Sequence, residues 1–208
     1  MRKTISCPSC GAPQPADNPG LVSFACDFCH SIFYLNEEKV LAAGNKSVLT
    51  EGFSRLYRGA GGSFHKKRFI VRGRVRYSFE RGFWDEWYLE MEDGSWIWLT
   101  EDGHEFCEQR DVDFDRRLSS VRFAPGTYFE MNERHFMVQE VGNTVCIGLE
   151  GALPKKIKLG ESYRYVDATS LDGNYSLGFE YDGQPPSAFL GRWLRGNELK
   201  MDDEGVDW

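Results

Sequence analysis

The stretch DEWYLEMEDGSWIWLTEDG, residues 85–103, decides the fold. Two alternating segments meet at Asp93 and Gly94, and an Asp-Gly pair between such segments is a strong signal for a β-hairpin. Because side chains alternate between the two faces of a strand, the first segment separates into an apolar face and a more polar face. These faces hold Trp87, Leu89 and Met91 on one side and Glu86, Tyr88 and Glu90 on the other. We therefore expect an antiparallel sheet with one face against a hydrophobic core.

The preceding segment RFIVRGRVRY, residues 68–77, alternates in the same way and predicts another strand. Its predicted apolar face consists of Phe69, Val71, Val75 and Tyr77. Its other face is an arginine ridge, whose members we name as candidate contacts to a ligand or partner: Arg68, Arg72, Arg74 and Arg76. Gly73 predicts a bulge or a close backbone contact within this strand.

Two interpretations of the arginine ridge remain open. A free ridge would suit nucleic acid or acidic lipid, because both present phosphate groups. Alternatively, Glu86 and Glu90 of the adjacent antiparallel strand lie opposite the arginines and neutralise them. We favour the pairing, because the six-residue connection 78–83 fits a hairpin between the two strands.

Four tryptophans lie in the same region, namely Trp84, Trp87, Trp96 and Trp98. They could form a stacking platform for a ligand or fill a core. Since Trp96 and Trp98 share one face while apolar Ile97 and Leu99 share the other, this strand is predicted to be buried on both sides. A role in the core is therefore favoured.

The N-terminal cysteines follow the pattern C-x2-C-x15-C-x2-C and are Cys7, Cys10, Cys26 and Cys29. Each pair lies in a short turn, so four thiolates can surround one tetrahedral ion. Four thiolates leave no open position on the metal, which suits a structural Zn²⁺ ion. Two disulfides and a rubredoxin-like iron site are the alternatives, and zinc is favoured over both. His30 lies just outside this set and is expected to be a solvated turn residue.

Composition narrows the class of protein. The chain has 208 residues, 41% of them hydrophobic, and no apolar run approaches the ~20 residues that span a bilayer. Asp and Glu number 32 against 25 Lys and Arg, and the net charge of -7 disfavours general attraction to phosphate backbones. The start MRKTISCPSC lacks the apolar segment of a secretion signal, so we expect a cytoplasmic protein.

The predicted fold class is mainly β, with three parts. Residues 1–47 would form a zinc ribbon and a short helix from Asn36 to about Ala43, because Asn36 and the glutamates after it resemble a helix start. Residues 48–115 and 116–208 would form two small antiparallel modules, each resembling a β-barrel or a β-sandwich.

A weak internal similarity supports this division into two modules. RFIV at 68–71 matches HFMV at 135–138 with an offset of 67 residues, and a glycine-containing turn precedes each segment. Equal spacing of this kind suggests a tandem repeat.

The residues point away from enzyme activity. The four histidines are scattered without a recognisable acid–base pair. Cys146 lies in the apolar segment TVCIGL and is expected to be an inert buried thiol. A dyad of Cys107 and His104 is chemically conceivable, but neighbours in sequence seldom reach the geometry of a dyad.

GRVRY at 73–77, the stretch 85–103 and YRYVDATSLDGNYSLGFEYDG at 163–183 together resemble the bacterial family DUF4178. The resemblance spans residues 48 to about 200. It implies tandem β-rich modules behind a cysteine-rich zinc segment, with no assigned catalytic residue, and a place in a membrane-stress-associated assembly. We therefore expect a non-enzymatic interaction or adaptor protein with a protein partner, and nucleic-acid binding through the ribbon and the arginine ridge is the alternative.

Overall fold

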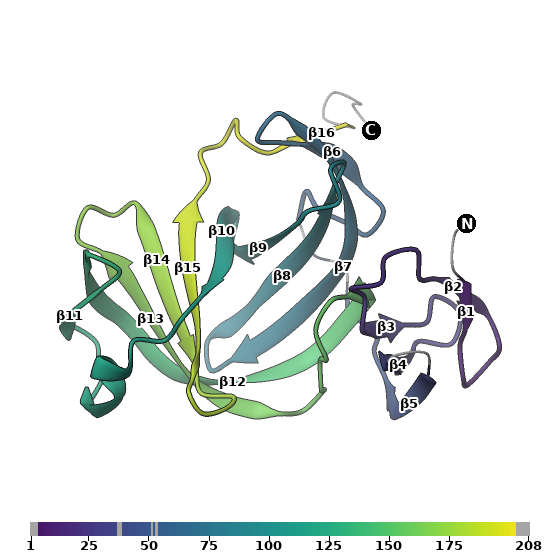
Figure 1. The fold of residues 1–208 in the computed structure, drawn as a ribbon, viewed down its shortest axis with the longest axis horizontal. Helices are drawn as coiled ribbons and strands as arrows, with labels where there is room; N and C mark the ends of the chain where they lie inside the picture. Colours follow the sequence, from purple (N-terminus) through teal and green to yellow (C-terminus); the bar gives the residue numbers. More distant parts are fainter. Residues whose placement is uncertain (1–3, 37–38, 51, 53, 203–208) are drawn as a thin grey trace.

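The computed structural model describes residues 4–36, 39–50, 52 and 54–202, and its regular structure is almost entirely β-strand (Figure 1). The one helical segment among these residues is a 3-10 turn, η1 (Arg116–Ser120). No helix in the described part of the chain has the length and apolar character needed to cross a membrane. The predicted mainly β class is confirmed.

Eight antiparallel strands form one closed barrel. Around the barrel, four strands follow in chain order and the other four follow in reverse chain order, and a pairing between β7 and β12 closes the sheet. The first run contains β7 (Lys67–Phe79), β8 (Gly82–Met91), β9 (Trp96–Asp102) and β10 (Glu105–Val112). The second run, in spatial order from β10, contains β15 (Ser187–Trp193), β14 (Tyr175–Glu180), β13 (Ser162–Ser170) and β12 (Arg134–Leu153).

The two predicted β modules are therefore two halves of one barrel. Strand β10 of the first half pairs with β15 of the second, and β7 pairs with β12 at the other seam. The expected Asp93-Gly94 hairpin joins β8 and β9, and Gly94 has a φ of 80°. The predicted limits at residues 47 and 115 fall in connections between elements, and as domain boundaries they stay predictions.

Additional segments cover the outer face of each half. Strands β6 (Gly61–Phe64) and β16 (Lys200–Met201) extend the sheet beside β7 and pack onto a cluster that contains Trp87 and Leu89. Strand β11 (Tyr128–Met131) and η1 cover a second cluster, which contains Val166 and Leu177. Trp87 of the first cluster and Leu177 of the second face away from the barrel lumen, because their strand neighbours Glu86 and Gly178 line it.

Segments related by the 67-residue offset make the same backbone contacts. Gly59 N–H donates to Val71 O at 2.9 Å, and Gly126 N–H donates to Val138 O at 2.8 Å. The register of β7 against β8 shifts after Val71, and that of β12 against β13 shifts after Val138. The two halves thus have matching bulges as well as matching turns.

The bulge in β7 corrects the predicted faces of this strand. The register shift lies between Val71 and Gly73, where we expected a bulge. One extra residue exchanges the two faces of the strand beyond it. Consequently Arg74 and Arg76 lie on the same face of the strand as Val71. The prediction had placed Val71 on the other face. The apolar set is divided at the same point into Phe69 and Val71 before the bulge and Val75 and Tyr77 after it.

The N-terminal part is a small β-rich ribbon that packs against one end of the barrel (Figure 1). Its strands are β1 (Thr4–Ser6), β2 (Pro13–Pro15), β3 (Ser23–Ala25), β4 (Ser31–Asn36) and β5 (Lys39–Lys46).

The helix predicted from Asn36 to Ala43 is wrong. Strand β4 ends at Asn36, and β5 returns antiparallel to it, with Leu35 opposite Val40. An isolated helix of this length is marginal in water, so the pairing of β5 with β4 outweighs the capping signal. Glu37 and Glu38, which contributed to the prediction, lie outside the described residues.

Candidate metal centre and barrel lumen

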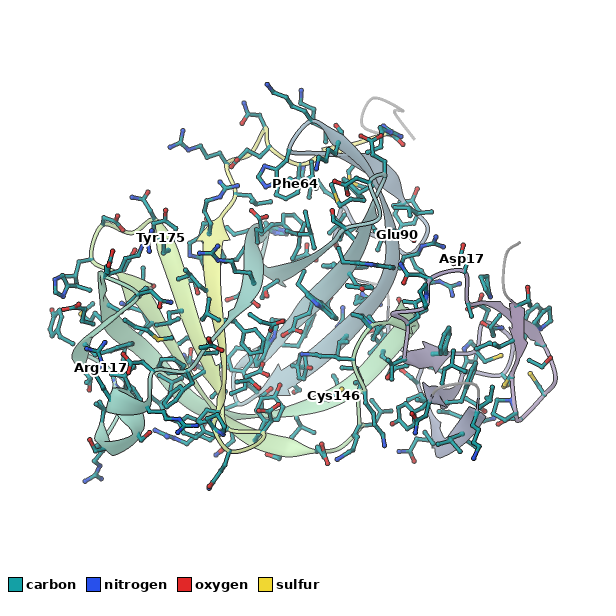
Figure 2. All side chains as sticks on the ribbon, viewed as in Figure 1. Asp17, Phe64, Glu90, Arg117, Cys146 and Tyr175 are labelled. Carbon is teal, nitrogen blue, oxygen red and sulfur yellow. The ribbon has the colours of Figure 1, made fainter. Side chains whose placement is uncertain are left out.

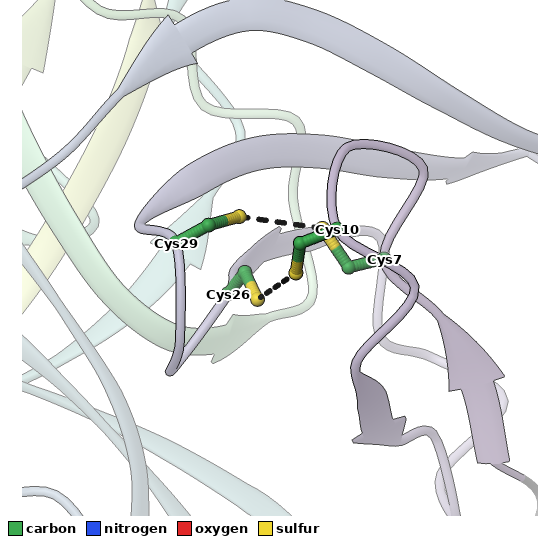
Figure 3. A group of neighbouring side chains, drawn as sticks. All are labelled: Cys7, Cys10, Cys26 and Cys29. Carbon is green, nitrogen blue, oxygen red and sulfur yellow. Dashed lines mark hydrogen bonds between the residues drawn. The ribbon is translucent and has the colours of Figure 1, made fainter.

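The four N-terminal cysteines meet at one point of the ribbon (Figure 3). Their four Sγ atoms all lie within 4.8 Å of one another. Two Sγ–Sγ distances, Cys7 to Cys29 and Cys10 to Cys26, are 3.7 Å. Four sulfurs bound tetrahedrally at about 2.3 Å from a zinc ion are about 3.8 Å apart. The geometry therefore fits a single tetrahedral metal ion.

The two cysteine pairs lie in equivalent turns. Gly11 N–H donates to Cys7 O, and His30 N–H donates to Cys26 O, each at 2.9 Å. The residue after each pair has a positive φ, 77° at Gly11 and 60° at His30. His30 is exposed and is not among the clustered ligand atoms, in agreement with its expected role as a turn residue.

The alternatives to zinc differ in how they fit. The cysteines carry free thiols, and 3.7 Å is far longer than the ~2.05 Å of a disulfide bond. Two disulfides are therefore inconsistent with the structure. Four thiolates bind iron as well as zinc, so the geometry supports a metal site without distinguishing between these two ions. In either case the closed ligand set would provide stability rather than catalysis.

Hydrogen bonds join this ribbon to the barrel. Strand β3 pairs with the end of β12, and Val22 N–H donates to Leu153 O at 2.7 Å. Ser23 Oγ donates to Lys155 O at 2.7 Å, and Tyr34 OH donates to Ile157 O at 2.7 Å. One hydrophobic cluster also runs through both parts. The metal centre thus supports the connection between β12 and β13 as well as the ribbon itself.

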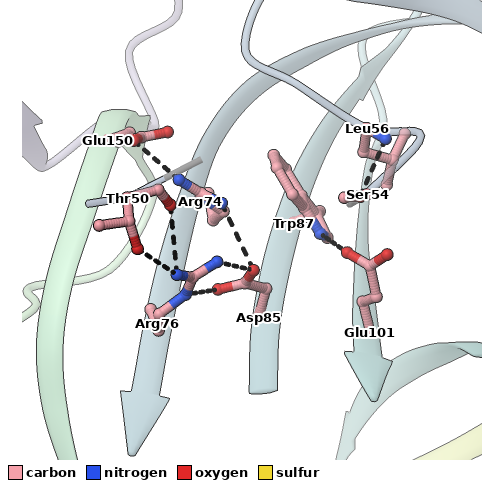
Figure 4. A network of polar contacts seen from close by, with 9 residues as sticks. All are labelled: Thr50, Ser54, Leu56, Arg74, Arg76, Asp85, Trp87, Glu101 and Glu150. Atoms are coloured by element: carbon pink, nitrogen blue, oxygen red, sulfur yellow. Dashed lines mark hydrogen bonds and ion pairs between the residues drawn. The ribbon is translucent and has the colours of Figure 1, made fainter. Parts of the chain in front are cut away.

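The inner two arginines of the arginine ridge belong to a buried network (Figure 4). Asp85 accepts two hydrogen bonds from Arg76, at 2.7 Å each, and one from Arg74 at 3.4 Å. Arg74 also pairs with Glu150 of β12 at 2.8 Å. Because the side chains of Arg74, Arg76 and Asp85 are only 4–5% exposed, this network is closed to an external partner.

The outer two arginines are paired at the surface. Arg72 contacts Glu90 of β8 and also lies 3.4 Å from Asp17 of the ribbon, and Arg68 contacts Asp202. In Figure 2, Glu90 and Asp17 both lie at the junction of barrel and ribbon. The favoured pairing is thus confirmed for Glu90, whereas Asp85 takes the position that we had given to Glu86. The structure brings none of the four arginines together as a free ridge.

Of the four tryptophans named in the sequence, Trp87 is buried and the other three are partly buried. Trp87 is 1% exposed, and its Nε1 donates to Glu101 at 2.7 Å. Trp96 stacks on Tyr88 with ring centroids 4.2 Å apart, and Trp98 lies beside the same tyrosine. Trp84 faces the barrel lumen, a position that the alternation pattern alone could not identify.

A cavity of about 230 Å³ lies inside the barrel. Residues from all eight barrel strands line it, which places it in the lumen. Five of the lining residues are acidic, and the lining contains no Lys or Arg. The acidic residues are Glu86, Asp102, Glu140, Asp167 and Glu180. Sequence reasoning missed this site, because its carboxylates are far apart in the chain and meet only when the barrel closes.

The lumen raises the pKa of two of its carboxyl groups. Desolvation, followed by the charges of Glu140 and Asp102, raises the pKa of Asp167 to about 7. Desolvation, followed by the charge of Glu86, raises the pKa of Glu180 to about 8. Desolvation and neighbouring like charges therefore make both carboxylates sensitive to pH near neutrality.

The cysteines outside the metal centre are poor nucleophiles. Burial raises the pKa of the Cys107 thiol and that of the Cys146 thiol, each to about 12. Both residues are at most 3% exposed, whereas His104 is exposed. Within the described residues no hydrogen bond or ion pair links Cys107 to His104, which leaves the conceivable dyad without support.

Comparison with known proteins gives one match. The family model described as "Domain of unknown function (DUF4178)" matches residues 58–196, which include all eight barrel strands. No curated protein and no solved structure matches the chain. The match begins after the ribbon, so the metal centre lies outside the region that defines the family.

Proposed function

Because this chain belongs to the DUF4178 family, whose function is unknown, we propose that it is a non-enzymatic, zinc-containing adaptor that binds another protein. The zinc ion would fix the ribbon against the barrel and so present a rigid contact surface. Four thiolates with the spacing of a tetrahedral site support the structural role of the metal.

The observation that carries the adaptor role is a pair of exposed apolar side chains near the metal centre. Phe28, in the second cysteine turn, is 71% exposed, and Val48 is 74% exposed. A hydrogen bond from Ser47 N–H to His30 O, 2.9 Å long, holds the segment before Val48 against the same turn. We call Phe28 and Val48 the knuckle patch. Large apolar groups on a rigid turn are typical of a protein contact.

A photo-crosslinker beside the knuckle patch tests this role in the native cell. Placed at Asp27, it should give one discrete crosslinked protein that disappears in the double variant Phe28→Ser with Val48→Ser. The matched control is Tyr128→Ser, because Tyr128 is 66% exposed on β11, outside the ribbon. Loss of the product in the control, or its persistence in the double variant, would argue against the adaptor role.

The absence of enzyme activity is part of the same proposal. Its support is that burial makes Cys107 and Cys146 unreactive and that the arginine ridge is occupied by internal carboxylates. Because these arginines are already paired with internal carboxylates, the arginine ridge gives no support to nucleic-acid binding. We also propose a cytoplasmic location, since six unbridged cysteines suit a reducing compartment, and a place in a membrane-stress-associated assembly.

A further inference from the structure

The lumen cavity has the dimensions of a site for a small ligand. Its volume of about 230 Å³ is somewhat below the range of roughly 300–1,000 Å³ found for drug-sized ligands. Its walls belong to a closed sheet, so the lining side chains are held by the barrel strands. A ligand of about ten heavy atoms or fewer is the appropriate size.

The chemistry of the walls selects a cation. The lining combines five acidic side chains with aromatic rings, among them Trp84, Phe189 and Trp193. Carboxylates and the faces of aromatic rings both attract ammonium groups, whereas an anion would find no Lys or Arg among these lining residues. An organic cation therefore matches the cavity better than a neutral or acidic molecule.

The protein itself places one ammonium group in this environment. Lys155 Nζ lies 5.4 Å from the centre of the Trp98 ring and 5.5 Å from that of Phe189, which also lines the cavity. Burial opposes the charge on Lys155, but the carboxylates of Glu86 and Glu180 outweigh it and raise the pKa of the lysine. The lumen thus already stabilises a buried ammonium group by aromatic and carboxylate contacts.

Asp167 offers a second position of the same kind. Its carboxylate has no hydrogen-bond or ion-pair partner among the described residues, although Glu140 beside it is bonded to Arg81 at 2.7 Å and to Tyr165 OH at 3.0 Å. Gly178 lies directly opposite Asp167 on β14 and also lines the cavity, and a Cβ at this position would lie 3.5 Å from Asp167 Oδ1. The Asp167 side chain also retains exposed surface, so a ligand can reach it.

A metal ion fits this position less well. Within the described part of the chain, only the four cysteines bring three or more potential metal-ligand atoms close enough together for one ion. We propose that the barrel lumen binds a small organic ammonium ion, with its charged group at Asp167 and Glu180 and its apolar part against the aromatic walls. This site is independent of the knuckle patch.

The test uses choline as the probe and 3,3-dimethylbutan-1-ol as its neutral isostere. Titration of the full-length zinc-loaded protein at about pH 8.5, at constant ionic strength, should show saturable choline binding by calorimetry and a change in tryptophan fluorescence. The neutral alcohol should bind at least about tenfold more weakly, because it lacks the charge that the carboxylates recognise. Equal binding of the two probes, or no saturable choline binding, would overturn the proposal.

Variants locate the site. Asp167→Asn and Glu180→Gln keep the shape of each side chain and should each weaken choline binding by about tenfold or more. Glu130→Gln on β11, which lies outside the lumen, is the matched control and should leave the dissociation constant unchanged. Thermal unfolding of each variant verifies the fold. Affinities that stay within twofold in both lumen variants would contradict the assigned position.

The pH dependence gives an independent readout. Choline keeps its charge at every pH, so a change in its affinity reports the protein. Asp167 faces Asp102 and Glu140, while Glu180 faces Glu86, Lys155, Asp182 and Tyr163. With pKa values of about 7 and about 8, both carboxyl groups lose their protons as the pH rises, so affinity should increase from about pH 6 to about pH 9. A flat profile would contradict this assignment.

Discussion

Replacing Asp85 by Ala tests the buried charge network of Arg74, Arg76 and Asp85. The substitution removes the carboxylate that accepts hydrogen bonds from both Arg76 and Arg74. Neither guanidinium can reach water easily, because both side chains are about 5% exposed or less. Arg74 keeps Glu150, whereas Arg76 keeps weaker contacts, to Thr50 at 3.3 and 3.4 Å and to the Phe83 ring, whose centre lies 4.0 Å from its guanidinium carbon. The variant therefore leaves at least one buried cation without its counter-charge.

The expected loss follows from the bonds that disappear. Two charge-assisted hydrogen bonds at 2.7 Å contribute about 1.5–3 kcal/mol each, which gives about 3–6 kcal/mol. Breaking a buried ion pair by removing one partner costs about 3–5 kcal/mol, in agreement with this sum. For a chain of this size, a loss of 3–5 kcal/mol lowers the unfolding temperature by roughly 6–20 °C. The double variant Arg76→Met with Asp85→Leu removes both charges and should be closer to the wild type than either single change.

Urea unfolding, followed by tryptophan fluorescence and circular dichroism with zinc saturating, measures these differences. The matched control is Glu161→Ala, which breaks the exposed Lys158–Glu161 pair and should cost less than about 0.5 kcal/mol. A loss below about 1 kcal/mol for Asp85→Ala would refute the reasoning. Such a result would mean that the arginines can leave the network and are available to an external partner.

Three further predictions follow from the metal centre, the barrel seam and the buried thiols. Elemental analysis should find about one zinc ion per chain, and a metal content well below one ion per chain would contradict the site. A strong chelator should lower the unfolding temperature markedly, because the binding free energy of structural zinc is about 10–16 kcal/mol. Gly151→Ala should destabilise the barrel by about 3 kcal/mol or more, because its Cβ would lie 2.1 Å from Arg72 O. Gly160 has a similar positive φ, 77° against 72°, but open space around the position of a Cβ, so Gly160→Ala should cost only about 1–2 kcal/mol. Equal losses in the two variants would exclude the steric argument. Iodoacetamide at about pH 8 should label Cys107 far more slowly than a free thiol, because a pKa of about 12 leaves roughly one thiol in ten thousand as the thiolate. Rapid labelling of Cys107 would contradict this prediction and support a reactive thiol.

The metal centre could be predicted from sequence because its information is local. Each cysteine pair spans four residues, and the two turns that hold the pairs need only Gly11 and His30 in a left-handed conformation. The hairpin at Asp93-Gly94 was predictable for the same reason, since a short turn with Gly94 at positive φ and alternating strands specify each other. The structure of the segment after Asn36 could not be predicted in this way, because it depends on the pairing of β5 with β4.

The arginine ridge shows how one residue can mislead a periodicity argument. Alternation assigns faces correctly on each side of Arg72, but the bulge there inserts an extra residue and exchanges the faces beyond it. The sequence indicated a bulge at Gly73 without indicating that Arg74 and Arg76 would share a face with Val71 and be buried beside Asp85. Gly73 lies opposite Gly151 across the β7–β12 seam, and a Cβ on Gly73 would lie 2.7 Å from Glu150 O. The position of the bulge is therefore set by a strand nearly eighty residues away.

Closure of the barrel explains why two similar halves do not form separate modules. A four-stranded antiparallel half would expose the backbone groups of two edge strands, which invites pairing with other chains. Pairing β10 with β15 and β7 with β12 satisfies all four edges at once. The same closure gathers acidic residues from both halves into one lumen, among them Glu86 of the first half and Glu180 of the second. We propose that the matching turns and bulges at an offset of 67 residues are the remains of a duplicated half-barrel. On this view, the lumen arises only from the union of the two copies, and neither half of the sequence could reveal it alone.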